Sequence, residues 1–166
     1  DTVYVNDGVF ITARDRFTLQ PRWSIRPVSE EGALDPWAAR RASVAGRLIE
    51  DTCSVTVHGQ TLVATTGIAQ NGDRDGDPGT FAVDCRSGRV MWSIVAARLD
   101  PQLDGATVRG PALIDGGVVV LGARKQAQGR RITSFYLFGV ALDTGKLLWV
   151  RPAGSALPRG RCGGTQ

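Results

Sequence analysis

The sequence has no long run of apolar residues. A helix that crosses a bilayer needs roughly 20 consecutive apolar residues, and no stretch of this chain approaches that length. The start of the chain also lacks the basic segment followed by an apolar one that marks a secretory leader. We therefore expect no membrane insertion. The chain opens at Asp1 directly into a strand-like run, and we expect the gene product to begin upstream of this residue.

Histidine and cysteine are scarce. The single histidine, His58, leaves no second imidazole for a zinc site, and its place in a predicted hairpin turn does not suggest a Ser-His-Asp triad. The three cysteines, Cys53, Cys85 and Cys162, have no zinc-binding spacing and, being odd in number, cannot all pair within the chain. The sequence leaves open one disulfide with one free thiol, or three buried thiols.

Lysine is rare as well. Only 2 of the 20 basic residues are lysines, and the arginines are scattered along the chain. The net charge of +4 is therefore not concentrated in a patch that would bind nucleic acid. The largest basic groups, at 40–41, 124–125 and 130–131, fall in predicted connections, where charged residues usually form a solvated face. We expect no nucleic-acid partner.

Glycine and alternating apolar residues are abundant. The chain of 166 residues is 42% hydrophobic and contains 21 glycines, a composition that favours a turn-rich all-β fold over a helical one. In residues 81–92 apolar residues alternate up to Asp84, a polar turn follows, and alternation resumes at Val90. This pattern predicts a tight hairpin between two half-buried strands, in which Gly88 supplies the positive φ that such turns often need.

The same pattern occurs three times. An Ala-x-Asp sequence, a Ser or Thr, a Gly and a Trp follow one another in residues 82–92, and again in residues 141–149 with a turn two residues shorter. Residues 13–23 repeat the pattern at the original spacing, with Leu19 in place of the glycine. The residues that carry the repeat are Ala13, Asp15, Trp23, Ala82, Asp84, Gly88, Trp92, Ala141, Asp143, Gly145 and Trp149.

This repeat resembles the tryptophan-docking motif of quinoprotein-type (PQQ-like) β-propellers. In that family the tryptophan of one blade packs against the alanine and the turn of the next blade. Because the motif aspartates recur in every copy, while catalysis happens in one place, we expect them to be structural. The resemblance also implies an extracytoplasmic location, in the periplasm or cell envelope, and a role as a platform for protein interactions.

The predicted strands divide the chain into successive parts. Residues 1–25 form a partial blade of three strands that lacks the innermost one, and residues 53–100 and 101–152 each form a complete blade of four strands. Residues 26–52 form an insertion between blades, with helical spacing in its second half. Residues 153–166 form a Gly- and Pro-rich tail in which no strand is predicted.

The expected fold is therefore all-β. It is a segment of a PQQ-like β-propeller with about two and three-quarter four-stranded antiparallel blades and one short helical insertion. So few blades do not close a ring, since propellers have four or more. We expect the partners to be the remaining blades of the same propeller or other protein subunits.

One loop carries a candidate metal site. Asn71, Asp73 and Asp75 stand at alternate positions before a glycine, as in the first half of an Asp-x-Asp-x-Asp-Gly calcium loop, and Asp77 adds a carboxylate. The second half does not match, because Ala82 stands where such a loop has a bidentate glutamate. A solvated, turn-rich loop explains the same residues. Calcium is the one metal that the sequence suggests, and we expect its binding to be weak.

The resemblance carries no PQQ site to this chain. Quinoprotein dehydrogenases of the family stack PQQ between a tryptophan and a disulfide of adjacent cysteines, and this chain has no adjacent cysteines. We predict no catalytic residue and expect no cofactor other than calcium in this segment. The leading hypothesis is a non-catalytic scaffold or binding segment of a larger propeller. The alternatives are part of a PQQ- or metal-dependent oxidoreductase with its catalytic residues on other blades, and a calcium-binding adhesive propeller.

Overall fold

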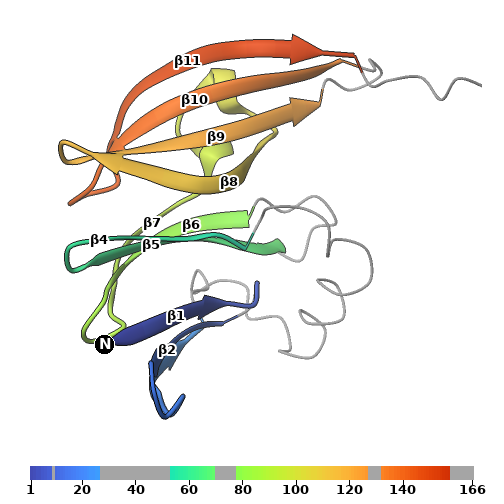
Figure 1. Ribbon diagram of the computed structural model, residues 1–166. Coiled ribbons are helices and arrows are strands. Elements are labelled where there is room, and N and C mark those ends of the chain that lie inside the picture. Colours follow the sequence, from blue (N-terminus) through green and yellow to red (C-terminus); the bar gives the residue numbers. More distant parts are fainter. Residues whose placement is uncertain (9, 27–52, 70–77, 127–131, 158–166) are drawn as a thin grey trace, which may run out of the picture.

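The chain forms three antiparallel sheets that follow one another along the molecule (Figure 1). The computed structural model describes residues 1–8, 10–26, 53–69, 78–126 and 132–157. These residues form eleven strands, two three-residue 3-10 helices and no α-helix. The sheets have three, four and four strands, which we name blade 1 (β1–β3), blade 2 (β4–β7) and blade 3 (β8–β11). The all-β prediction with four-stranded antiparallel blades is confirmed.

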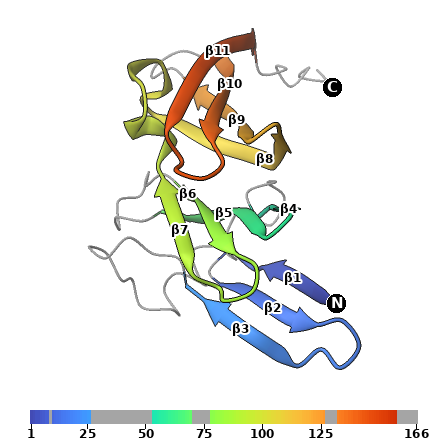
Figure 2. The same ribbon diagram turned by 90° about the vertical axis from the view of Figure 1, so that its left-hand side faces the viewer.

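Blade 1 has β2 as its central strand (Figure 2). The Asn6 side chain stabilises the turn between β1 and β2, because its Oδ1 accepts a hydrogen bond from the Gly8 N–H at 2.9 Å. Alternation along β2 places Ile11 and Ala13 in the core. The strands β1, β2 and β3 span Thr2–Asn6, Ile11–Asp15 and Pro21–Ile25.

Blade 2 is a layer with a core on each side. Its strands β4 to β7 span Val55–His58, Thr61–Ala69, Pro78–Asp84 and Val90–Ile94. Because successive side chains of a strand point to opposite faces, Leu62 and Phe81 belong to the core on the side of blade 1. Val63 and Ala82, their neighbours in sequence, belong to the core on the side of blade 3.

Blade 3 follows two short 3-10 helices. These helices, η1 (Ala96–Arg98) and η2 (Pro101–Leu103), carry the chain from β7 to β8, and Asp100 caps η2 by accepting a hydrogen bond from the Gln102 N–H at 2.8 Å. The strands β8 to β11 span Ala106–Asp115, Val118–Gln126, Thr133–Ala141 and Leu147–Ala156.

The last strand is longer than the sequence predicted. We expected no strand after position 152, yet β11 continues to Ala156 by pairing with the start of β10 beyond a register shift. Pro152 is tolerated because β11 lies at the edge of its sheet, where one side of the strand needs no partner. The predicted helical insertion at 26–52 lies, from position 27 on, outside the described residues. Among the described residues, no helix is long and apolar enough to cross a membrane.

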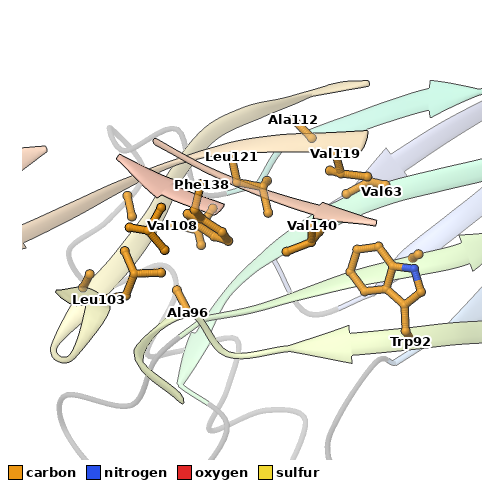
Figure 3. Packing of buried hydrophobic residues seen from close by; sticks show 14 residues of the cluster. Val63, Trp92, Ala96, Leu103, Val108, Ala112, Val119, Leu121, Phe138 and Val140 are labelled. Carbon is orange, nitrogen blue, oxygen red and sulfur yellow. The ribbon is translucent and has the colours of Figure 1, made fainter. Parts of the chain in front are cut away.

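Two hydrophobic cores join the blades. The core between blades 1 and 2 contains Ile11, Leu62, Ala64, Phe81, Val83 and Cys85. The core between blades 2 and 3 is larger, with Trp92 at one end and Leu103 and Ala96 at the other (Figure 3). Burying an aliphatic or aromatic side chain stabilises a fold by roughly 1.5–3 kcal/mol. Each blade is therefore stabilised mainly through the neighbour that covers it.

Candidate functional site

Each blade has the same hairpin turn between its last two strands. In each turn a residue with positive φ donates its N–H to the carbonyl four residues earlier. The donor–acceptor pairs are Leu19–Asp15 at 3.0 Å, Gly88–Asp84 at 2.9 Å and Gly145–Ala141 at 2.8 Å. The donor φ angles are 57°, 74° and 69° in that order. We call these three hairpins the docking turns.

The sequence comparison predicts that the docking turn of blade 3 is two residues shorter than the others. This prediction is wrong. Gly139 lies directly opposite Trp149 on the neighbouring strand, as Ala82 lies opposite Trp92 in blade 2. Gly139 therefore occupies the alanine position of the motif, and Ala141 lies two residues further on, where the turn begins. The sequence comparison aligned residues by identity, whereas the backbone ladder sets the register.

Trp23 of blade 1 docks on the turn of blade 2. Its Nε1–H donates to the Cys85 carbonyl at 3.0 Å, and the Tyr4 hydroxyl donates to the same carbonyl at 3.3 Å. The indole lies over Gly88, where an added Cβ would come within 2.8 Å of the ring atom Cδ2. Glycine alone leaves this space free. Burial, together with the contact to Cys85, raises the pKa of Tyr4 to about 12.

Trp92 of blade 2 makes the same contact with blade 3. Its Nε1–H donates to the Leu142 carbonyl at 2.8 Å, and an added Cβ on Gly145 would come within 2.8 Å of its Cδ2. The indole is buried in the core between the two blades, next to Val63 and Val140 (Figure 3). A buried indole usually needs a partner for its N–H, and this carbonyl supplies it.

Hydrogen bonds within each blade hold the two accepting carbonyls, of Cys85 and Leu142, in place. The N–H of Cys85 donates to the Gln60 carbonyl at 2.8 Å, and the N–H of Leu142 donates to the Gly117 carbonyl at 2.8 Å. Both acceptors lie in the hairpin between the first two strands of the same blade. The docking turn is therefore fixed to its own blade by bonds that do not involve the neighbouring indole.

The aspartates of blades 1 and 2 hold their docking turns. Asp84 Oδ1 accepts hydrogen bonds from the Ser87 hydroxyl at 2.6 Å and the Ser87 N–H at 2.8 Å. Asp15 accepts from the Thr18 N–H at 3.0 Å and from the Arg22 guanidinium at 2.7 Å. Because these bonds favour the charged form, they lower the pKa of both carboxyls below the ordinary value of 3.8.

Asp143 does not hold its turn in this way. It lies inside the docking turn of blade 3, and its Oδ1 accepts a hydrogen bond from the Thr144 hydroxyl at 3.3 Å. The Thr144 Oγ1 in turn accepts from the Lys146 N–H at 3.4 Å. Blade 3 has Ala141 where blade 2 has Asp84, so backbone bonds and Thr144 hold this turn.

Trp149 has no turn to dock on among the described residues. Its indole is half-buried and lies against Gly139 of its own sheet, so closely that a side chain at Gly139 would not fit. Within the described part of the chain, no hydrogen bond to its Nε1–H is seen, unlike Trp23 and Trp92. Among the described residues, Trp149 is therefore the motif tryptophan that has no docking turn of a following blade to contact.

Trp149 belongs to a row of residues that crosses blade 3. The ladder aligns this row as Leu113, Val120, Gly139 and Trp149. The corresponding row of blade 2 is Thr56, Val63, Ala82 and Trp92. We call these the docking rows. Blade 3 covers the row of blade 2, with Trp92 8% exposed, whereas Leu113 in the row of blade 3 is 65% exposed.

Polar contacts between the first strands of blades 2 and 3, β4 and β8, which we call the inner strands, were not predicted from the sequence. The Ser54 hydroxyl donates to the Gly110 carbonyl at 2.9 Å, and the Thr56 hydroxyl donates to the Ala112 carbonyl at 2.8 Å. A Ser-x-Thr alternation places both hydroxyls on one face of the strand. This alternation is a usable signal, but the sequence does not say that backbone carbonyls of the next blade would face it.

The candidate calcium residues, Asn71, Asp73, Asp75 and Asp77, lie outside the described residues. Within the described ranges no group of three or more His, Cys, Asp or Glu side chains could hold a metal ion. Cys85 is a buried free thiol in the core between blades 1 and 2, where burial raises its pKa. Cys85 is therefore part of the packing of that core.

Comparison with known proteins supports the fold. No protein-family model and no curated protein matches this chain. The crystal structure of quinohemoprotein alcohol dehydrogenase from Comamonas testosteroni matches 91% of this chain, with a TM-score of 0.55 and 18% sequence identity. The fold is that of a segment of a PQQ-type β-propeller. The chain spans 19% of the length of that dehydrogenase, so the likeness describes the blades and not an activity.

Proposed function

We propose that this propeller segment is a non-catalytic scaffold whose open blade faces bind further blades of the same propeller or other protein subunits, as a platform for protein interactions. The observation that carries the proposal is the docking row of blade 3. It has the same backbone geometry as the buried row of blade 2, and it exposes Leu113 and leaves Trp149 undocked. Exposed apolar surface of this kind marks interaction sites.

The internal interfaces support an expectation of what the partner of blade 3 offers. Trp23 and Trp92 each need a glycine in the left-handed conformation and a backbone carbonyl that faces their Nε1–H. We expect Trp149 to need the same two groups. A hairpin of the docking-turn type supplies both, whether it belongs to another blade of the same propeller or to a separate subunit.

The row of blade 3 also differs from that of blade 2 on the inner strand. Thr56 donates a hydrogen bond to the next blade, while the equivalent Leu113 has no polar group. The partner of blade 3 therefore meets the inner strand through apolar packing.

The proposal is tested by lengthening the full chain with a second copy of residues 101–157 at its C-terminus. The added copy brings a docking turn with glycine, so we expect it to cover the docking row of blade 3. Hydrogen exchange of the Trp149 indole N–H, followed by NMR, should become slow, and the urea midpoint should rise. The matched control carries Trp149→Ala and should lose the gain in midpoint. Unchanged exchange at Trp149 in the lengthened chain would refute the proposal.

A calcium-binding adhesive propeller is the alternative that the 71–77 loop supports. With three carboxylates and no closing glutamate, we expect a dissociation constant on the order of 10⁻⁴–10⁻³ M. Isothermal titration of the chain with calcium measures it, with Asp75→Ala as the control. Micromolar binding that disappears in the control would favour the adhesive function over the scaffold.

Part of a PQQ- or metal-dependent oxidoreductase is the other alternative, and the likeness to quinohemoprotein alcohol dehydrogenase supports it. The described residues do not fit PQQ, because Cys85 has no adjacent cysteine and lies in the core between blades. We expect no change in the PQQ absorption spectrum on titration with this chain. Saturable binding would move the preference to the oxidoreductase. The extracytoplasmic location implied by the repeat remains part of the proposal.

A further inference from the structure

The face of blade 1 that points away from blade 2 differs from the equivalent faces of blades 2 and 3. In the register of the ladders, the residues on either side of the motif alanine or glycine are a Phe and a Val in blades 2 and 3, and all four are buried against the preceding blade. The equivalent residues of blade 1 are a threonine and an arginine. The three pairs are Phe81 and Val83, Phe138 and Val140, and Thr12 and Arg14.

The docking turn of blade 1 differs at the position that receives an indole. Leu19 stands where blades 2 and 3 have Gly88 and Gly145, and at both glycines an added Cβ would lie 2.8 Å from a ring atom of the docked tryptophan. Among the described residues, Leu19 is the non-glycine residue with positive φ, at 57°. This conformation is unfavourable for a branched side chain. Its side chain is 59% exposed, so packing within the chain does not explain it.

Arg14 closes the same site from the side. Its Nη1 donates to the Leu19 carbonyl at 3.0 Å, so the guanidinium lies against the docking turn. The Thr12 hydroxyl shares a hydrogen bond of 3.0 Å with the Ser24 hydroxyl on the same face. Val3 and Val5 of β1 alternate with the core-facing Tyr4 and remain exposed on this face. The face is apolar along β1 and polar beside the docking turn.

We infer that Leu19 makes blade 1 unable to receive a docking tryptophan. A second copy of this chain does not fit, because its Trp149 would meet Leu19 where the turn needs glycine. The two ends of the segment are therefore different: blade 3 offers a tryptophan, and blade 1 excludes one. This inference rests on the proposed role of the blade faces as docking surfaces.

The first experiment transfers Leu19 to a turn that does receive an indole. The change Gly145→Leu in the full chain places the side chain under Trp92. We expect the Trp92 indole N–H to lose its protection from hydrogen exchange, while the Trp23 indole N–H, on the turn of blade 2, keeps its own. Retained protection of Trp92 would overturn the inference, since a leucine would then be compatible with docking. If Gly145→Leu loses both signals together with the folded NMR spectrum, the protein has unfolded. Gly145→Ala then repeats the test, because it adds a smaller obstacle at the same backbone position.

The second experiment opens blade 1. The triple change Thr12→Phe, Arg14→Val and Leu19→Gly installs the receiving residues of blade 2. We expect new association between chains, seen as a shift to faster sedimentation that a further Trp149→Ala removes. The matched control carries Thr12→Phe and Arg14→Val with Leu19 retained, and it should show no association that depends on Trp149. The inference would be overturned if the control associates and Trp149→Ala removes that association. It would also be overturned if the unchanged chain associates in a way that Trp149→Ala removes.

The two experiments also separate this inference from the proposed function. If Gly145→Leu releases Trp92 but the triple variant does not associate, Leu19 still excludes an indole. The face of blade 3 is then not a docking surface, and the proposed function fails instead.

Discussion

The two interfaces between blades use the same docking contact but differ in how completely they are built. Between blades 2 and 3, Ser54, which comes directly before the inner strand β4, and Thr56 within β4 donate hydrogen bonds to carbonyls of β8. Among the described residues blade 1 has no strand at this position, and Asn6 of β1 donates instead to the Ser54 and Thr65 carbonyls, at 3.2 Å and 2.8 Å. Val57 of β4 is left 46% exposed.

This comparison shows that the tryptophan alone does not make an interface. Trp23 is half-buried although its hydrogen bond and its glycine match those of Trp92. The interface between blades 2 and 3 also has the contacts of the inner strand β4, which lies at the opposite edge of the sheet from β7 and its Trp92. We therefore expect the contact between blades 1 and 2 to be the weaker one, and the following changes test this order.

Trp92→Ala should have the largest effect. It removes a buried indole and leaves a cavity in the larger core, so we expect a loss of about 3–5 kcal/mol in the free energy of unfolding. Trp23→Ala removes a half-buried indole and should cost clearly less. Urea unfolding followed by circular dichroism compares the two variants. Equal losses would contradict the expected order of the two interfaces.

Gly145→Ala should have the next largest effect. The new Cβ would lie 2.8 Å from the Trp92 ring, in a residue whose φ of 69° already disfavours a side chain. Gly117→Ala is the matched control, because its φ is 79° and an added Cβ meets nothing within 4 Å. We expect about 1–2 kcal/mol from the backbone in both variants and about 1–3 kcal/mol more at Gly145 from overpacking. Equal costs in thermal unfolding would show that the indole moves aside freely.

Thr56→Val should weaken only the interface between blades 2 and 3. It removes the hydrogen bond to the Ala112 carbonyl with little change in shape, and a net loss of about 0.5–1.5 kcal/mol is expected for one such bond. Thr12→Val, on the open face of blade 1, should be close to neutral. Denaturant midpoints of the two variants test this difference. A larger loss of stability in Thr12→Val would contradict the role of Thr56 in the interface.

The smallest effect is expected from removing the Asp84 carboxylate, which makes the docking turn of blade 2 sensitive to acid. Because the Asp84 pKa is lowered in the fold, its contribution to stability is present above the ordinary value of 3.8 and is lost as the pH falls below it. Asp84→Asn should therefore lower the thermal midpoint at neutral pH and flatten its decline as the pH falls below the ordinary value. Asp143→Asn should lower the thermal midpoint at neutral pH less, since Asp143 accepts one long hydrogen bond. A reversed order would show that Asp143 holds its turn after all.

Much of the fold could be predicted from local patterns. Alternating apolar residues and turn glycines located the hairpin around Asp84 and Gly88, and the recurrence of tryptophan indicated blades. The register in blade 3 could not be predicted, because Gly139 and Ala141 are both small and only the ladder shows which lies opposite Trp149. The hydrogen bonds of Ser54 and Thr56 were missed because their acceptors are backbone carbonyls more than fifty residues away.

The sequence by itself determined the strands, the turns and the side chains that dock, since each depends on residues a few positions apart. Tertiary structure decided which of these side chains are buried. Trp92 and Trp149 stand in equivalent places on equivalent strands, yet Trp92 is buried beneath Gly145 and Leu142 of the next blade while Trp149 is half-buried. Burial depends on apolar area removed from water, and a neighbouring sheet removes that area.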